Sequence, residues 1–320
     1  MTVYALKRLL LFIPTLILVS LVIFSVMRII PGDPALLVLV GDEGEGSYTQ
    51  EEYDEVKRKL GLDKHPVEQY LRWIWRVLKL DFGKSFFYHN VTVADELKAR
   101  MPITGQLAVM AVVLSFIVAV PLGVLSAVKQ DTWFDYVAKI ITISGVALPT
   151  FWVGILIVFI LARFFGYLPP LGYADLWENP WTNLQQMIFP SLALAFNNMA
   201  FTARLTRSSM LEVFHEDYVR TARAKGLPER IVIVRHTLKN AFLPVITVSG
   251  WQFGRLIAGT VIIESIFVVP GLGKLLIFGI DHRDFTLVQG VIILVTFSVL
   301  LSNLIVDIVY SWLDPRIRYT

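Results

Sequence analysis

The chain contains no cysteine, and only 17% of its 320 residues are charged, whereas about 25% are charged in soluble globular proteins. Without cysteine there can be no disulfide framework, cysteine-ligated metal site or thiol nucleophile. The shortage of charge, together with 55% hydrophobic residues, argues against a soluble enzyme and favours a membrane protein. The net charge of +3 is also too small to indicate nucleic-acid binding.

Catalytic motifs are missing as well. Gly273-Lys274 resembles the end of a P-loop, but Val268 and Leu275 replace the phosphate-binding glycine and the hydroxyl that binds Mg²⁺. The five histidines show no metal-ligand spacing, and no serine lies in a Gly-x-Ser-x-Gly turn. The sequence therefore predicts a non-catalytic chain without a metal or cofactor of its own, and it disfavours a membrane-embedded hydrolase.

The apolar residues are concentrated in six long runs, each of about the twenty residues needed to cross a bilayer. The runs are 9–27, 103–128, 140–162, 184–203, 241–269 and 287–313. The first run exceeds the roughly 7 to 15 apolar residues of a signal peptide, which indicates a retained anchor. We predict an all-α integral membrane protein with six transmembrane helices.

Lysine and arginine in the short flanks predict the orientation, because cytoplasmic loops retain positive charge. An N-terminus inside the cell places 14 of these residues in the cytoplasm and 3 outside, and the segment 204–239 alone carries eight. The segment 28–100 then lies outside, where a loop longer than about 60 residues escapes the rule. Both termini are predicted to be cytoplasmic.

The external segment has helical signals of its own. Thr49 and Glu52 have capping-box spacing, and Pro66 suits a first helical position. An apolar, largely aromatic stripe follows at helical spacing, formed by Tyr70, Trp73, Ile74, Val77 and Leu78. It either packs against the bundle or membrane interface, or forms a docking surface. The predicted organisation is an N-terminal transmembrane helix (1–30), an external helical insertion (31–101) and a five-helix core (102–320).

The predicted cytoplasmic loop at 204–240 contains a short helix. Glu216 and Asp217 lie at its start, basic residues follow, and Gly226 with Pro228 ends it. Tyr218, Thr221, Ala222 and Lys225 share one face at i+3 and i+4 spacing. Because so short a helix is marginal alone, something must hold it. A groove on a partner and an anionic lipid surface are the two alternatives.

The chain resembles the permeases of ABC importers, in the branch that includes dipeptide, oligopeptide, nickel and glutathione permeases. The likeness covers nearly the whole chain, and within that branch it is to the first of two paired permease subunits. The matching segments are Ile30-Pro31-Gly32-Asp33-Pro34, Pro121-Leu122-Gly123-Val124, Ala203 to Met210, Tyr218 to Gly226, Arg235-His236, Leu243-Pro244, Pro270-Gly271-Leu272-Gly273, Val288-Gln289-Gly290 and Asp314-Pro315-Arg316-Ile317-Arg318. One departure is Arg220-Thr221-Ala222, where the general pattern has Glu-Ala-Ala.

This resemblance implies a type I importer permease in the cell membrane of a prokaryote. Its partners would be a homologous second permease, two cytoplasmic ATPases that bind ATP and Mg²⁺, an external solute-binding protein, a peptide-like solute and membrane lipid. The loop helix would dock on an ATPase and transmit its closure to the spans. The implied coupling residues are Glu216, Asp217, Tyr218, Thr221, Ala222, Lys225, Gly226 and Leu227.

Polar side chains within the spans are costly in lipid and therefore face the bundle interior or a watery path. Asn197, Asn198, Gln252 and Arg255 are candidates for the translocation pathway, and hydrogen bonding between helices is the alternative for the three amides. An ion-coupled secondary transporter with Glu264 or Asp307 as its coupling acid remains a second candidate function. Interrupted spans in an inverted repeat would favour such a transporter, and the sequence shows none.

Overall fold

The computed structural model describes residues 2–29, 33, 35–36, 39, 48–85, 87 and 91–313. Within these residues the fold is helical, and the only β-structure is an isolated antiparallel bridge between Lys84 and Thr92. The elements are α1 (Thr2–Ile29), α3 (Gln50–Lys59), α4 (Pro66–Leu78), α5 (Val93–Val128), α6 (Trp133–Ala147), α7 (Thr150–Phe165), α8 (Pro180–Phe214), α9 (Asp217–Ala224), α10 (Glu229–Ile231), η1 (Val232–Leu238), α11 (Lys239–Gly259), α12 (Val261–Ile266), α13 (Leu272–Asp281) and α14 (Phe285–Leu313).

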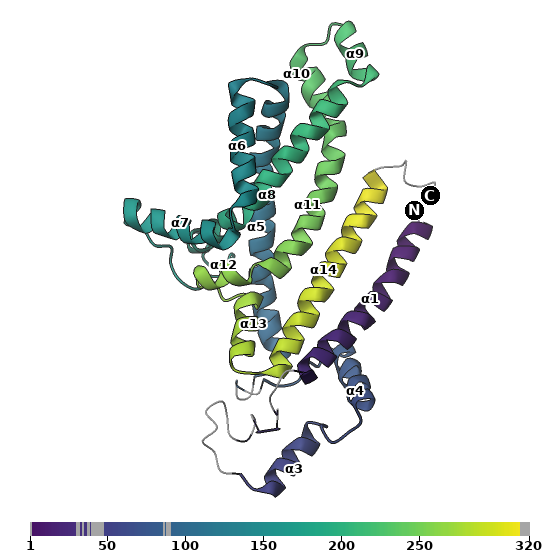
Figure 1. Cartoon of the computed structure of the whole chain (residues 1–320), viewed down its shortest axis with the longest axis vertical. Coiled ribbons are helices and arrows are strands. Elements are labelled where there is room, and N and C mark those ends of the chain that lie inside the picture. Colours follow the sequence, from purple (N-terminus) through teal and green to yellow (C-terminus); the bar gives the residue numbers. More distant parts are fainter. Residues whose placement is uncertain are drawn as a thin grey trace.

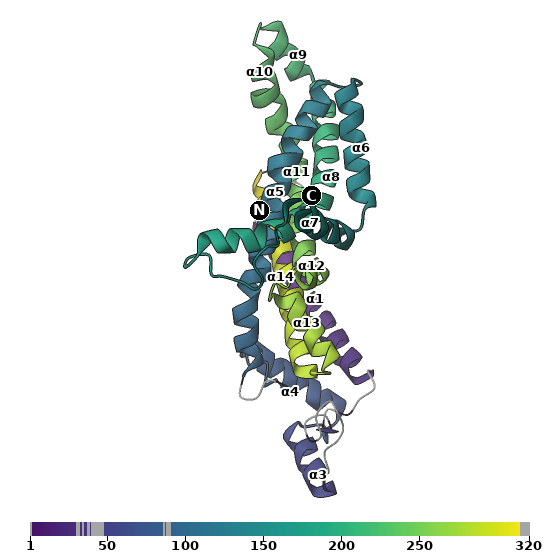
Figure 2. The ribbon, with the colours of Figure 1, turned by 90° about the vertical axis from the view of Figure 1, so that its left-hand side faces the viewer.

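The long helices run roughly along one axis, and the insertion lies at one end of them (Figures 1 and 2). The ends of α1 and α14 that carry the termini point away from α3 and α4 (Figure 1). The α9 helix also lies at the end opposite to the insertion (Figure 1). The side of the membrane on which the termini and the basic loop lie remains a prediction.

The two helices of the insertion, α3 and α4, begin at the signals read from the sequence. Thr49 and Glu52 form a complete capping box at the start of α3, and Pro66 occupies the first turn of α4. The Tyr70 hydroxyl lies 2.8 Å from Ser20 Oγ on α1, and Tyr70 and Trp73 both pack against Phe24. This part of the stripe therefore packs against the bundle. The predicted boundary at 101/102 falls inside α5, which starts at Val93.

Helices α5 and α8 form the central pair of the bundle. Lipid tails are as apolar as leucine, so close packing rather than hydrophobic transfer holds membrane helices together, and small residues permit it. A Cβ atom at Gly123 of α5 would lie 2.6 Å from the carbonyl oxygen of Ala203 and 2.6 Å from Cβ of Thr206, both on α8. Two of the family-like segments thus meet at a close contact between these helices.

Four helical segments of the described chain are long and apolar enough to cross a membrane, and the α6–α7 pair raises the number to five if it counts as one span. The four are α1, α5, the α10–α11 segment 229–259, and α14. The predicted span 184–203 lies inside α8, whose 35 residues are long enough to cross a membrane. Helix α8 is not, however, among the segments that are also apolar enough. Gln185, Gln186, Asn197 and Asn198 interrupt that run. A sixth crossing there remains a prediction.

The predicted third span, 140–162, is not one straight helix. Helices α6 and α7 meet at a bend of 107°. Proline lacks an N–H group and disfavours helical geometry in the residue before it. Leu148, which precedes Pro149, is accordingly extended, with φ −80° and ψ 128°. Pro149 therefore breaks the span.

The predicted fifth span, 241–269, is also wrong in its second half. Helix α11 ends at Gly259, and a separate short helix, α12, carries Glu264. The chain then reverses at Val268, whose φ is +57°, and enters α13. Arg255 and Glu264 therefore lie on different helices.

Candidate functional site

The candidate coupling site is the α9 loop, which we define as residues 215–238, between the long helices α8 and α11. It contains α9, α10 and η1 in that order. Figure 1 shows it projecting beyond the other helices at one end of the molecule. No strand or other domain covers it in the described chain, so its own contacts must hold it in shape.

The loop has a small apolar core. Val219 and Ala222 of α9 are 0% and 5% exposed, and they pack with Val232 of η1, Phe214 of α8 and Leu227. Spacing of three residues places Val219 and Ala222 on the same side of the helix. The burial of Ala222 corrects the prediction that this side chain enters a groove on a partner. The side chain is instead covered by its own chain.

The opposite side of α9 faces outward. Asp217, Thr221 and Ala224 are exposed there, and Tyr218 and Lys225 flank them. The predicted face is therefore only partly correct, because Tyr218, Thr221 and Lys225 are accessible whereas Ala222 is not. Ala224, which the sequence pattern did not single out, is the small residue that an approaching protein would meet. Glu216 is the N-terminal cap residue, without a side-chain capping bond.

The end of α9 is stabilised by conformation and charge. Gly226 has φ +77°, the left-handed conformation that glycine adopts without steric cost and that the predicted stop requires. Beyond it, Arg223 Nη2 lies 2.8 Å from Glu229 Oε1, which ties α9 to α10. Hydrogen bonding to this guanidinium lowers the pKa of Glu229, and the same bond raises the pKa of Arg223. The pair therefore stays ionised at neutral pH.

The loop returns to the bundle through a π-helix, η1, seven residues long. Such wide turns are rare, usually single, and frequent at functional sites. Thr237 Oγ1 donates to the carbonyl of Val232, five residues back, at 3.2 Å. Arg235 and His236 lie in this segment. Near the start of α11, Asn240 Nδ2 donates a 2.9 Å hydrogen bond to the Tyr218 hydroxyl. Helix α9 is thus linked to the span that follows it.

A buried ion cluster lies before the loop, where α8 meets α5 and α6. Asp135 of α6 is 0% exposed and accepts two 2.8 Å hydrogen bonds from the guanidinium of Arg207 on α8. Lys139 Nζ lies 2.9 Å from the same carboxylate, and Ser126 Oγ of α5 donates to it at 2.5 Å. These bonds join α5, α6 and α8 near the loop.

The four candidate pathway residues have different environments. Asn197 Nδ2 donates to the carbonyl of Gly145 on α6, and Gln252 accepts from Thr202 on α8, so both connect helices. Asn198 bonds only within α8, to the carbonyl of Leu194. Arg255 is exposed. The contacts of Asn197 and Gln252 fit the interhelical alternative.

Glu264, considered above as a coupling acid, is fully buried beside α13. Thr104 and Thr260 hydroxyls donate to Oε1 at 2.7 and 2.8 Å, and the backbone N–H of Lys274 donates to Oε2 at 3.0 Å. Gly271 lies against the carboxylate, since a Cβ atom there would be 2.4 Å from Glu264 Cδ. A carboxylate at a helix N-terminus is stabilised by the free N–H groups and the helix dipole. The arrangement is that of a structural anchor.

Two of the family-like segments fall partly or wholly outside the described residues. The segment 314–318 is outside, and of 30–34 only Asp33 is described. Asp33 accepts hydrogen bonds from the Ala35 N–H and from the Tyr53 hydroxyl, at 2.8 and 2.6 Å. The hydrogen bond to Asp33 raises the pKa of the Tyr53 hydroxyl.

Membrane-length helices packed through small residues, with a braced helix beyond them, define an integral membrane protein of the helical class. The chain belongs to the family described as binding-protein-dependent transport system inner membrane component, whose model matches residues 119–319. A companion model for the N-terminal part of such components matches residues 1–108. The protein is therefore a permease subunit of an ABC importer, as the sequence resemblance indicated.

Relatives match along the whole chain. The dipeptide transport system permease protein DppB of Escherichia coli is 38% identical over 339 residues, covering 99% of this chain and 98% of the relative. DppB of Alkalihalophilus pseudofirmus is 37% identical over 339 residues, with both chains fully covered. These matches lend no support to an ion-coupled secondary transporter.

One solved structure supports the fold. The MetNI methionine ABC transporter, in an inward-facing conformation, aligns with a TM-score of 0.57 and 16% identity, covering 68% of this chain and 96% of that chain. At this identity the likeness concerns the fold alone.

Proposed function

We propose that this permease forms half of a translocation pathway for di- or oligopeptides, or for related small solutes. The full-length similarity to two dipeptide permeases supports this solute class. A homologous second permease completes the pathway, an external solute-binding protein delivers the solute, and two cytoplasmic ATPases bind ATP and Mg²⁺. ATP hydrolysis takes place on those partners.

The α9 loop carries the coupling role in this proposal. Its outward face is free, while Val219 and Ala222 anchor its inner face to η1 and α8. A force applied by an ATPase is therefore transmitted to α8 and, through η1, to α11. Closure of the ATPase dimer switches the cavity from inward-facing to outward-facing, and hydrolysis resets it. Among the four pathway candidates, Arg255 is the exposed one and the one we assign to the solute path.

Docking of an ATPase on the outward face of α9 can be tested with bulky substitutions. We expect Thr221→Trp and Ala224→Trp each to reduce co-purification of the ATPases and solute-stimulated hydrolysis in proteoliposomes at least tenfold. Both side chains are exposed, so the chain itself should keep its unfolding temperature. Glu212→Trp, at an exposed position near the end of α8, is the matched control and should assemble normally.

Ala222→Trp gives a different expected result, because this side chain is buried in the core of the loop. Overpacking of that kind costs about 1–3 kcal/mol, so the variant should unfold at a lower temperature as well as lose the ATPases. If Thr221→Trp and Ala224→Trp couple like the parent, the ATPases do not dock on this face, and a lipid surface becomes the better partner for α9.

Orientation is testable in this cysteine-free chain. Asp63 lies in the exposed turn between α3 and α4, and Arg230 is exposed in α10. Single cysteines at these positions should react differently with a membrane-impermeant thiol reagent in intact cells, position 63 strongly and position 230 only after lysis. The opposite pattern would reverse the proposed topology, in which both termini are cytoplasmic.

A further inference from the structure

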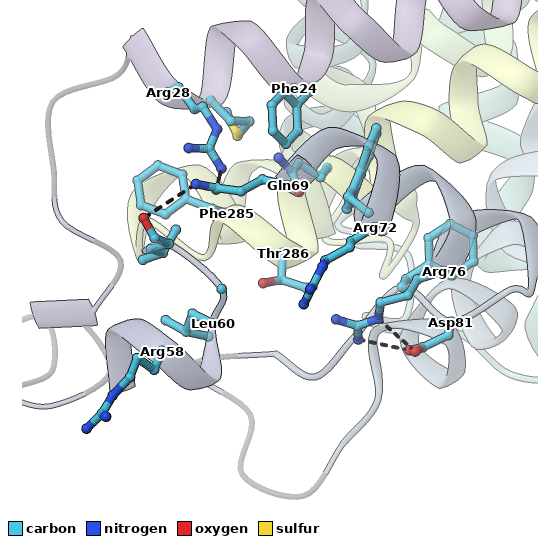
Figure 3. Close-up of a pocket in the computed structure, with 16 residues that line it drawn as sticks. Phe24, Arg28, Arg58, Leu60, Gln69, Arg72, Arg76, Asp81, Phe285 and Thr286 are labelled. Atoms are coloured by element: carbon cyan, nitrogen blue, oxygen red, sulfur yellow. Dashed lines mark hydrogen bonds and ion pairs between the residues drawn. The ribbon is translucent and has the colours of Figure 1, made fainter. Parts of the chain in front are cut away.

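A cleft of about 490 Å³ lies where the outer ends of α1 and α14 meet the insertion (Figure 3). Four arginines contribute to its lining, Arg28, Arg58, Arg72 and Arg76, against one acidic residue, Asp81. The remainder is largely apolar, including Phe24, Trp73 and Phe285. A cationic cleft with an apolar wall fits a ligand that combines an anion with hydrocarbon.

The arginines are not equally committed to partners within the protein. Arg76 is held by Asp81, with Nε 2.8 Å from Oδ2. Arg72 pairs with Glu68 only through an exposed contact on the same helix, a type worth little in water. Arg28 bonds to the amide of Gln69, without an acidic partner among the described residues. Figure 3 shows Arg72 directed toward Thr286, whereas the head group of Arg58 points away from the other arginines. Arg28 and Arg72 are therefore available to an anion.

Helix α4 adds an exposed apolar face beside this cleft. Val67, Leu71, Trp75 and Leu78 are 60%, 58%, 60% and 70% exposed. At 100° per residue they form one side of the helix, and Trp75 adjoins Arg72, three positions earlier. Lys79 Nζ lies 5.0 Å from the centre of the Trp75 ring. An aromatic ring with a neighbouring cation is typical of residues at the membrane–water interface.

The depth of α4 identifies what covers this face. Tyr70 bonds to Ser20, nine residues before the end of α1 at Ile29, or about 13 Å along the helix axis. Helix α4 therefore packs beside the last turns of a span rather than beyond it. Figure 2 shows α4 lying across the direction of the long helices, the orientation of a helix in the interface plane. Beside a membrane span at this depth, we expect the medium around an exposed apolar face to be lipid.

We propose that α4 is an interfacial helix that binds an anionic phospholipid of the leaflet on the insertion side. Its phosphodiester lies in the arginine-lined cleft, near Arg28 and Arg72, and its acyl chains lie along Val67, Leu71, Trp75 and Leu78. This inference is independent of the transported solute and of which side of the membrane the insertion occupies.

The headgroup site is tested by native mass spectrometry of the complex that contains this chain, exchanged with dioleoylphosphatidylglycerol or dioleoylphosphatidylcholine. The parent should retain phosphatidylglycerol roughly tenfold better than phosphatidylcholine, and Arg28→Gln/Arg72→Gln should lose this preference. Arg163→Gln, at an exposed position near the end of α7, is the control and should behave like the parent.

Two results, one from competition with inorganic phosphate and one from a transport assay on the same variants, would overturn the proposal. If excess inorganic phosphate displaces phosphatidylglycerol, the cleft takes a free anion. If the double variant keeps the lipid preference but loses transport, the arginines serve a solute or a protein instead.

The apolar face is tested by fluorescence quenching in phosphatidylglycerol vesicles. The emission component removed by Trp75→Phe should lose more than half its intensity to lipids brominated on the acyl chain, and little to aqueous iodide. Trp177, which is 89% exposed in the loop before α8, provides the comparison, and the component removed by Trp177→Phe should show the reverse preference. Quenching of Trp75 by iodide alone would place α4 in water and reject the proposal.

Discussion

Asp135→Asn is expected to destabilise the permease by about 3–5 kcal/mol, the usual effect of removing one partner from a buried ion pair. The carboxylate is fully buried, so its loss leaves the charge of Arg207 with neutral partners in a medium of low dielectric. The amide cannot accept both guanidinium bonds, the Lys139 contact and the Ser126 hydrogen bond together. Titration of the purified chain with denaturing detergent should show the loss.

The neighbouring Asp131 is the matched control. Its side chain is 66% exposed and lies 3.9 Å from Lys139, so Asp131→Asn should cost no more than about 1 kcal/mol. Asp135→Asn combined with Arg207→Gln should be less damaging than the sum of the single changes, because neither charge is then left alone. Equal effects of Asp131→Asn and Asp135→Asn would show that the cluster does not hold α6 to α8.

This cluster also bears on coupling. Arg207 lies on α8, seven residues before the helix ends at Phe214, and α9 packs against Phe214. In the coupling route proposed above, the segment of α8 that would receive a push from α9 is the one that Asp135 fixes to α6 and α5. A permease variant that folds without the Asp135–Arg207 ion pair should hydrolyse ATP with its partners but transport less solute per ATP.

Features set by neighbouring residues could be predicted from the sequence. The capping box of Thr49 and Glu52 and the proline start of α4 depend only on a few adjacent side chains, and the structure has both. The glycine stop at Gly226 is local in the same sense. The length of the apolar runs similarly indicated α1, α5 and α14.

Features that depend on distant partners could not be predicted in the same way. Hydropathy alone does not distinguish a straight span from the bent α6–α7 pair, which Pro149 interrupts. The buried side of α9 depends on Val232, which returns to it only because the chain reverses after Pro228. Periodicity therefore identified the helix but placed Ala222 on the wrong side. The role of Glu264 likewise required Thr104, 160 positions away.

Gly271→Ala is the second substitution for which we expect a large effect. A Cβ atom at this position would lie 2.4 Å from Cδ and Oε1 of Glu264 and 2.5 Å from Oε2. These distances are shorter than any that a Cβ atom normally keeps from non-bonded atoms. Relief requires the buried carboxylate to move away from Thr104, Thr260 and the Lys274 N–H. A buried charge without its donors costs several kcal/mol, so we expect a loss of about 3–5 kcal/mol and poor insertion or assembly.

Gly259→Ala is the matched control, because a Cβ atom there meets nothing within 4 Å. Adding one methyl group at the end of α11 should therefore change stability by less than about 1 kcal/mol. The cause of the Gly271 effect can be isolated with Glu264→Ser, which shortens the side chain and removes the overlap. Gly271→Ala should then cost much less in the Glu264→Ser background than in the parent. If the cost is the same in both backgrounds, the contact with Glu264 is not what selects glycine at this position.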